Sequence, residues 1–244
     1  MHLSKRLQMV TNCVTKGSTV ADVGCDHAYI SIYLIEHEIA KKTVALDINK
    51  GPLERAAKNV SEYGYEDRIM TRLSNGLEKL EVGEADSIVI AGMGGDLMVR
   101  ILSERDACVK VAKEVILQPQ SEVDKVRRYL HKLKFTIRKE DMCIDDGKYY
   151  VVIHAVNTLE EPRNQQETLE ETLSSKVDDK YGPLLLRNQH PILKQFLEKE
   201  RKTARLIEDK LKRHQNERNE LRLKELQEEI EMLDFALDYY NTKD

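Results

Sequence analysis

The sequence predicts an α/β fold, in which a doubly wound, mainly parallel sheet with an antiparallel last strand precedes an all-α coiled-coil region. Three observations support this prediction. Short apolar runs alternate with helical patterns over residues 1–157, as in parallel sheets covered by helices. Two successive strand patterns flank the turn at 145–148, so one of them must run antiparallel to its neighbour. From 158 to 244 only helical patterns occur, which predicts domains at 1–157 and 158–244.

Apolar runs place the individual strands and helices of the first domain. The expected strands are 19–23, 43–47, 69–73, 87–91, 114–117, 135–144 and 149–156. Helical patterns cover 1–16, 28–38 and 97–102, and another helix starts near Pro52, a favourable first-turn residue. We expect Ser121 to cap the helix that follows the fifth strand.

Apolar residues near heptad spacing follow a linker at 160–164. They are Leu193, Leu197, Ala204, Ile207 and Leu211 in a first run, and Leu223, Leu226, Ile230, Leu233, Leu237 and Tyr240 in a second. The polar segment 212–219 between the runs favours an antiparallel hairpin of two helices, and one unbroken helix is the competing interpretation. Because a hairpin can close on itself or recruit a partner, we expect a monomer and leave a homodimer through the coiled coil open.

Composition excludes several classes of protein. The chain has 244 residues with a formal net charge of −4, so no global basic field indicates nucleic acid, and any RNA surface must be local. The four cysteines lie far apart without a CxxC pair, which argues against a metal site or a disulfide framework and suits a reducing compartment. No apolar run approaches the roughly 20 residues of a membrane span. Without an apolar signal core near Met1, we expect a cytoplasmic protein.

The stretch 19–29 organises the first domain. A strand ends at Asp22, a turn follows at Gly24, and an apolar-periodic helix begins after Ala28. A strand, a glycine turn and a helix with free N–H groups at its start form a nucleotide-type pocket. Polar residues and glycines also follow the next three strands, and the carboxyl ends of parallel strands share one crevice. The candidate cofactor-binding residues at these four ends are Asp22, Gly24, Cys25, Asp26, Asp47, Ile48, Asn75, Gly76, Ala91, Gly92, Met93 and Gly94.

Electrostatics selects among the possible cofactors. Asp47 lies 23 residues after Gly24, a spacing at which an acid accepts hydrogen bonds from ribose hydroxyls, although a solvated strand-end acid is the alternative. The turn is not GxGxxG, and Asp22 and Asp26 would repel a pyrophosphate. This disfavours a nicotinamide-dependent oxidoreductase. It suits S-adenosylmethionine, whose methionine end carries an ammonium and a sulfonium group.

Three sequence strings make a family resemblance specific. The segments 22–29 (DVGCDHAY) and 91–95 (AGMGG), together with Gln118-Pro119, resemble the bacterial tRNA (adenine-N1)-methyltransferases called TrmK. The resemblance covers the whole chain. It implies a class I, Rossmann-like catalytic domain, a coiled-coil accessory domain that binds tRNA, S-adenosylmethionine as cofactor, and methylation of adenine 22 in the D-arm of tRNA. Asn75 and Gln120 depart from the expected pattern, where an acid and an asparagine are more usual.

Four residues are candidates for the chemistry. N1 of neutral adenine has a free lone pair, so the reaction mainly requires alignment, and a carboxylate would stabilise the cationic product. Asp26 is the first candidate for that carboxylate and Asp96 the second. His27 could accept a proton from the adenine amine, and Tyr29 could stack on the base. The structural alternatives are a helix cap for Asp26, a buried His27, a core Tyr29 and a helix-dipole role for Asp96.

Two basic stretches could contact RNA, at 125–139 and at 194–213. We expect the second, which includes Lys202, Arg205 and Arg213, to clamp tRNA, unless its basic face pairs with the acidic second helix. A non-catalytic RNA- or protein-binding module on a methyltransferase-like scaffold is the alternative function. Such a scaffold would not need to keep Asp47 and the Gly24 turn polar.

Overall fold

The computed structural model describes residues 1–158, 172–213 and 217–241. The chain forms two compact units, residues 1–163 and residues 164–244. The expected linker at 160–164 lies outside the described residues.

The first unit is built on one seven-stranded sheet with the order β3-β2-β1-β4-β5-β7-β6. β7 runs antiparallel to β5 and β6, and the remaining pairs are parallel, so the predicted fold class is confirmed. The strands are β1 (Ser18–Val23), β2 (Ala40–Asp47), β3 (Ile69–Leu73), β4 (Ser87–Met93), β5 (Glu114–Pro119), β6 (Phe135–Asp145) and β7 (Lys148–Asn157).

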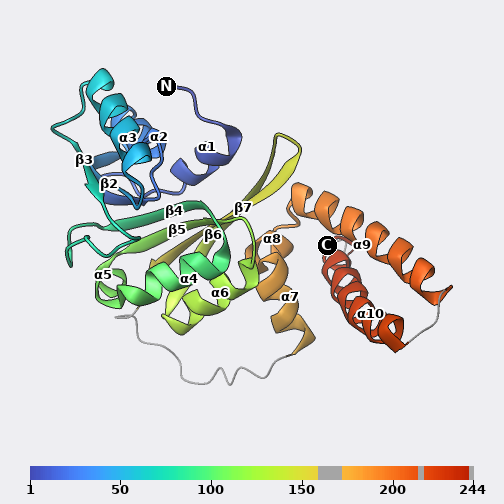
Figure 1. Cartoon of the computed structure of the whole chain (residues 1–244). Helices are drawn as coiled ribbons and strands as arrows, with labels where there is room; N and C mark the ends of the chain where they lie inside the picture. The colour runs from blue at the N-terminus through green and yellow to red at the C-terminus, as the bar shows by residue number, and fades with distance from the viewer. Residues whose placement is uncertain (159–171, 214–216, 242–244) are drawn as a thin grey trace. The chain divides into compact units, whose positions relative to one another are not determined.

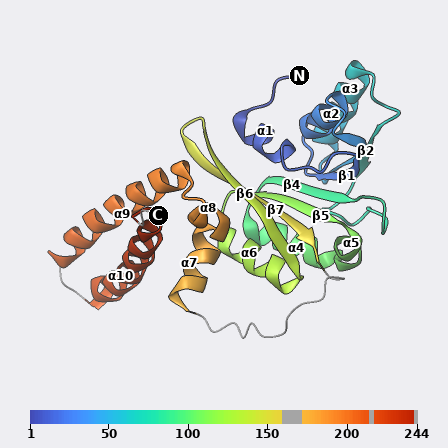
Figure 2. The same ribbon diagram turned by 180° about the vertical axis from the view of Figure 1, so that it is seen from behind.

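Helices cover both faces of this sheet (Figures 1 and 2). One face carries α1 (Lys5–Thr11), α2 (Tyr29–Glu36) and α3 (Lys50–Tyr63), and the other carries α4 (Gly95–Glu104), α5 (Asp106–Val111) and α6 (Val123–Lys132). Alternate strand residues enter the two cores: Val20 and Val89 pack on the first side, and Ala21 and Ile88 pack on the second. α1 is shorter than the predicted helix 1–16, because the chain turns after its C-cap, Asn12.

The strand order reverses between β1 and β4. β2 and β3 lie on one side of β1, whereas β4 and β5 lie on the other. At such a switch point the following helices cover opposite faces, which leaves a crevice beyond the carboxyl ends of the two strands. The fold therefore places the ends of β1 and β4 at the centre of the candidate site.

The second unit is helical, with α7 (Leu173–Tyr181), α8 (Pro183–Arg187), α9 (Pro191–Lys212) and α10 (Glu217–Asp238). α9 and α10 are antiparallel, because Lys194 lies over the ring of Tyr240 whereas Arg205, farther along, contacts Asp234. The unbroken-helix alternative is therefore wrong. Most predicted apolar positions are buried or half-buried between the helices, but Ile207 is exposed.

The start of α6 corrects the predicted Ser121 cap. Glu122 is the N-cap, with φ of 46°, and the Ser121 hydroxyl instead bonds the Glu122 carboxylate. This backbone path brings the Ser121 carbonyl against α4, where it accepts the Gly95 N–H at 2.9 Å. A Cβ on Gly95 would overlap the carbonyl oxygens of Ser121 and Glu122, so only glycine allows this approach.

We expect Gly95→Ala to lower the free energy of unfolding by about 1–3 kcal/mol, because backbone atoms would have to move. Gly94→Ala is the matched control. Its φ is −66°, and its added Cβ would meet the side-chain hydroxyl of Ser121 at 3.0 Å, which can rotate away, and no backbone atom. Urea denaturation of both variants measures the difference. Equal stability of the two variants would contradict the proposed backbone overlap.

A buried carboxylate connects three strands with the segment before β1. It lies at the amino-terminal end of β5, opposite the strand ends that form the candidate site. Glu114 is 3% exposed and accepts hydrogen bonds from the Thr15 N–H (2.9 Å) and hydroxyl (2.6 Å), the Ser87 hydroxyl (2.5 Å) and His154 Nε2 (2.9 Å). Although burial opposes ionisation, these donors together hold the pKa of Glu114 at about 2.

Glu114→Gln should cost about 2 kcal/mol at pH 7, because the amide cannot accept all of these bonds. A lowered folded-state pKa stabilises the protein above the unfolded value of about 4.3 and loses that effect as pH falls towards 2. Chemical denaturation at several pH values should therefore show that the difference in free energy of unfolding between the variant and the unsubstituted protein becomes smaller below pH 4. Replacement of the exposed Glu54 by Gln is the control and should change stability by less than about 0.5 kcal/mol.

Candidate active site

The turn between β1 and α2 is held by the end of β2. The N–H groups of Gly24 and Cys25 both donate to the Leu46 carbonyl, at 2.8 and 3.0 Å. The Asp26 N–H donates to Asp47 Oδ2 at 3.2 Å. These three N–H groups of the turn are therefore bonded within the protein. A pyrophosphate would meet carboxylates here instead of a backbone cradle.

Asp22 ties α2 to the end of β1. Its side chain is buried, and its Oδ2 accepts the Ser31 hydroxyl at 2.8 Å. Burial raises the pKa of Asp22 to about 6, with a further contribution from the neighbouring charge of Asp47. The carboxylate thus titrates just below neutral pH, beside the crevice.

Asp47 is a positioned acid, and the alternative of a solvated strand-end carboxylate is wrong. Asp47 is only 7% exposed. Its two carboxylate oxygens accept hydrogen bonds from the N–H groups of Asn49 (2.8 Å) and Asp26 (3.2 Å). Each carboxylate oxygen has two lone pairs, so Asp47 retains acceptor capacity for a pair of hydroxyls. The next residue, Ile48, is exposed and offers an apolar surface at the same strand end.

Cys25 is buried within this group of acids. Burial, together with Asp22, Asp47 and Asp26, raises the pKa of the Cys25 thiol. The thiol therefore stays protonated at neutral pH and contributes packing to the turn.

Asp26, His27 and Tyr29 project from the outer side of the turn. The Asp26 side chain is 66% exposed, and its carboxylate lies 3.6 Å from His27 Nε2. The rings of His27 and Tyr29 are stacked with centroids 5.2 Å apart and an interplanar angle of 12°. The N-cap of α2 is Ala28, without a side-chain cap. The helix-cap alternative for Asp26 is therefore wrong, and so are a buried His27 and a core Tyr29, because both side chains reach solvent.

The end of β4 lies against the turn after β1. A Cβ on Gly24 would overlap Met93 Cε, so the Met93 side chain covers the turn, and the φ of 72° at Gly24 favours glycine there. Gly92 has φ of 80°, and Ala91 and Gly94 beside it are half-buried. The ends of β1 and β4, predicted to meet, are thus in contact.

The remaining sequence candidates lie at the margins of this site. Asn75 is exposed after β3, and Gly76, with φ of 54°, packs against Ile101. Asp96 is in the first turn of α4, where both of its carboxylate oxygens lie 2.8 Å from Lys125 Nζ. Asp96 is therefore already neutralised by a lysine, whereas Asp26 has the neighbouring His27.

Sequence reasoning missed Arg6, which α1 brings to the end of β4. Its Nη1 donates to Gln118 Oε1 at 2.8 Å, and its guanidinium lies over the Tyr150 ring, 5.6 Å from the centroid. A Cβ on Gly92 would lie 3.4 Å from Arg6 Nη1. Arg6 and Gln118 are 112 residues apart, so no local pattern could have joined them.

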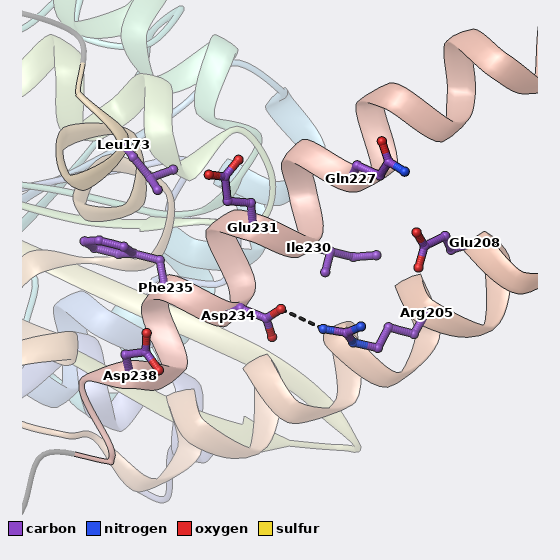
Figure 3. Close-up of a pocket in the computed structure, with 9 residues that line it drawn as sticks. All are labelled: Leu173, Arg205, Glu208, Gln227, Ile230, Glu231, Asp234, Phe235 and Asp238. Atoms are coloured by element: carbon purple, nitrogen blue, oxygen red, sulfur yellow. Dashed lines mark hydrogen bonds and ion pairs between the residues drawn. The ribbon is translucent and has the colours of Figure 1, made fainter.

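The helical unit contains a hollow between α9 and α10 (Figure 3). Arg205, the cation that lines it, bonds Asp234 at 2.7 Å. Four carboxylates are among the remaining lining residues, which are Leu173, Glu208, Gln227, Ile230, Glu231, Asp234, Phe235 and Asp238. This hollow therefore does not suit a phosphate.

Two further findings concern the described residues alone. None of their helices is long and apolar enough to cross a membrane. Their histidines, cysteines and acids form no group of three that could hold a metal ion.

Comparison with known proteins assigns the family. A family model described as a methyltransferase domain matches residues 3–153. The chain is 31% identical over 240 residues to the tRNA (adenine(22)-N(1))-methyltransferase of Bacillus subtilis, and this match covers 98% of each protein.

Solved structures agree over nearly the full length. The crystal structure of the B. subtilis m1A22 tRNA methyltransferase TrmK matches with a TM-score of 0.83 and 30% identity, and covers 97% of this chain and 99% of that one. TrmK of M. capricolum, solved with S-adenosylhomocysteine, matches with a TM-score of 0.81 and 27% identity over 98% and 99% of the two chains. Because the methyltransferase family model matches most of the chain and a relative that is 31% identical matches nearly its full length, the chain belongs to the TrmK family of tRNA (adenine(22)-N(1))-methyltransferases.

Proposed function

We propose that this chain uses S-adenosylmethionine to methylate N1 of adenine 22 in tRNA. The observation that carries the proposal is the cluster of acids at the switch point, which suits a cationic methyl donor and opposes a dinucleotide. The full-length similarity to a tRNA (adenine(22)-N(1))-methyltransferase supports the choice of substrate and atom.

The residues of the crevice fit the methyl donor. Asp47 would accept the ribose hydroxyls, because it is fixed at the end of β2 with acceptor capacity left. Asp22 would attract the ammonium group, and the half-buried Ala91 and Gly92 at the end of β4 would border the cofactor. The exposed side chains of Ile48 and Asn75 would border the adenine of the cofactor.

The chemistry needs alignment more than proton removal. When bound, S-adenosylmethionine supplies the methyl group that the free lone pair of adenine N1 accepts. Tyr29, exposed and stacked on His27, would hold the target base, which must be unpaired to expose N1. The Asp26 carboxylate would stabilise the positive charge that develops on the base, and His27 would bond its amine.

The charges of α9 divide into two sets. Arg201 and Arg205 contact Asp234 of α10, so the alternative that this helix pairs with its acidic neighbour holds for these residues. Lys202, Lys210 and Arg213 are exposed and have no salt bridge within the described part of the chain. Their spacing places them on one helix face, away from Ala204, which is buried against α10. We propose this face, defined by Lys202, Lys210 and Arg213, as the tRNA-contacting surface of α9.

The hairpin also bears on assembly and location. α9 and α10 bury Leu197, Ala204, Leu226 and Leu233 within one chain, which supports a monomer. A tRNA substrate and four free cysteines support a cytoplasmic location.

Mass spectrometry of nucleosides tests the function. Unmodified tRNA with adenine 22 is incubated with the protein and S-adenosylmethionine, and the expected product is one N1-methyladenosine per molecule. A transcript with guanine at position 22 is the control and should remain unmethylated. Failure of the first transcript to gain the methyl group would refute the proposal.

We expect the affinity for S-adenosylhomocysteine to fall as pH drops below about 6, where Asp22 becomes protonated. A ligand whose ammonium favours the ionised carboxylate loses up to about tenfold in affinity per pH unit below that pKa. Calorimetry between pH 5 and 8 measures this dependence. The Asp22→Asn variant should bind S-adenosylhomocysteine more weakly at pH 7.5, and its affinity should not fall further below pH 6. If its affinity still fell there as in the unsubstituted protein, another group would be responsible for the pH dependence.

Asp26→Asn should lower kcat by about 10- to 100-fold, because it removes a charge that stabilises the transition state. Its affinity for S-adenosylhomocysteine should change much less. Asp96→Asn is the matched control and should retain most turnover, because the Asp96 charge is already paired with Lys125. A larger loss of kcat in Asp96→Asn would reverse the two assignments.

Replacing Lys202, Lys210 and Arg213 together by Gln should weaken tRNA binding and reduce the slope of log affinity against log salt by up to about 2–3. Replacing Arg201 and Arg205 by Gln is the control. This pair should change the salt slope less, because Asp234 already neutralises it. Binding titrations at several salt concentrations measure both, and equal slopes in the two variants would contradict the proposed surface.

A further inference from the structure

A groove of about 430 Å³ lies between α1 and β6, outside the cofactor crevice. α1 packs beside β6, the edge strand of the sheet (Figure 1). The end of β6 fixes the start of α1, because the Asp145 carboxylate accepts the main-chain N–H of Arg6 at 3.1 Å. Ligand pockets in proteins span roughly 300–1,000 Å³, so this groove is large enough for one small ligand.

The lining of the groove combines apolar and polar groups. Met9 is buried and Cys143 half-buried in the core that α1 shares with this face of the sheet. Their sulfur atoms are polarisable and pack favourably against aromatic rings. Beside them, Gln8 Nε2 donates to Asn12 Oδ1 at 2.9 Å. Gln8 Oε1 and Asn12 Nδ2 form no hydrogen bond within the described residues, so an acceptor and a donor remain for a ligand.

Positive charge exceeds negative charge around the groove. Lys5 belongs to the lining at the start of α1, and Lys139 lies at the other end, close enough to Cys13 to act on its thiol electrostatically. Both lysines are exposed and form no salt bridge in the part of the chain that the structure describes. The carboxylate in the lining, Asp141, already accepts a main-chain N–H at 2.8 Å. The charges therefore suit a phosphate at the Lys5 end.

The groove begins beside the crevice. α1 also carries Arg6, whose Nη1 bonds Gln118 of β5 at 2.8 Å and lies next to Gly92 at the end of β4. A target adenine must leave its stack to expose N1, which also removes stacking from the nucleotides next to it. Proteins bind an unstacked RNA base with side chains that cover its face and hydrogen-bond its edge. The groove offers both kinds of group next to the crevice.

We propose that the groove between α1 and β6 binds one nucleotide of the tRNA that neighbours the target adenine. The base packs on Met9 and Cys143, its edge bonds Gln8 and Asn12, and its phosphate contacts Lys5. This inference rests on the proposed methylation of tRNA. It adds an RNA-binding site in the catalytic unit to the surface proposed on α9.

The thiol of Cys143 reports whether the groove is occupied. The other three cysteines are buried, so N-ethylmaleimide should modify Cys143 first. Burial raises the pKa of this thiol, so the reaction is followed at pH 8, by peptide mass spectrometry. With tRNA at about ten times its Kd, about one groove in eleven is open, and labelling should slow by up to about tenfold. S-adenosylhomocysteine alone should leave the rate nearly unchanged.

Two variants separate the contacts to phosphate and base. Lys5→Gln should raise the KM for tRNA about 3- to 10-fold and reduce the salt slope of tRNA binding by about 1, because it removes a phosphate contact. Asn12→Ala should raise KM by a similar factor and leave the slope unchanged, because the lost contact is uncharged. Both variants should keep the affinity for S-adenosylhomocysteine, which a merely structural defect would lower.

Lys16→Gln is the matched control for the lysine variant. It removes one exposed positive charge next to Thr15, which bonds Glu114 at the amino-terminal end of β5, so KM for tRNA should not change.

Unchanged labelling of Cys143 in a protein that binds tRNA would overturn the proposal, because the RNA would then pass outside the groove. Equal slowing by S-adenosylhomocysteine alone would also overturn it, by assigning the groove to the cofactor. Equal rises in KM for Lys5→Gln and Lys16→Gln would do the same, since they would show only an effect of net charge. If the unsubstituted protein neither bound tRNA nor methylated adenine 22, the proposed function itself would fail.

Discussion

The end of β2 determines what the pocket can hold. The Leu46 carbonyl accepts two N–H groups from the turn after β1, and the Asp47 carboxylate accepts a third. In phosphate-binding turns of related architecture such N–H groups face the ligand. Here they are bonded within the protein, and the turn presents carboxylates instead. This arrangement suits a cationic cofactor better than a pyrophosphate.

The acids around the turn occupy different environments and can therefore serve different roles. Asp22 is buried, with its pKa raised to about 6, whereas the Asp26 side chain is largely exposed beside His27. Asp47 lies between these extremes, fixed by two N–H groups. Burial and hydrogen bonding thus give these three aspartates different environments, and the separate roles that we propose for them rest on this difference.

The two units of the chain use charge differently. The crevice in the first unit gathers acids that suit a small cationic ligand. In the helical unit, Arg201 and Arg205 are neutralised across the hairpin, while Lys202, Lys210 and Arg213 stay on the outer face. A polyanion would contact the second set. Counting basic residues along α9 could not separate these sets, because the pairing depends on which residues face α10.

The sequence by itself determined the positions of the strands, the antiparallel end of the sheet and the residues after each strand. These follow from local periodicity and from the rule that parallel strands end on one edge. It also indicated the family through the strings at 22–29 and 91–95. Local patterns were enough here, because each motif lies within one strand and its following turn.

Only the tertiary structure decided which groups are free. The N–H groups of the turn are used by β2, Asp96 is paired with Lys125, and Ser121 does not cap α6. Arg6 reaches Gln118 across 112 residues. Apart from Ser121, whose hydroxyl bonds the adjacent Glu122, each of these groups has a partner that is distant in the sequence, and local propensity carries no information about such partners. The sequence thus located the strand-end motifs of the site, and packing determined the charge and hydrogen-bonding capacity that those motifs present.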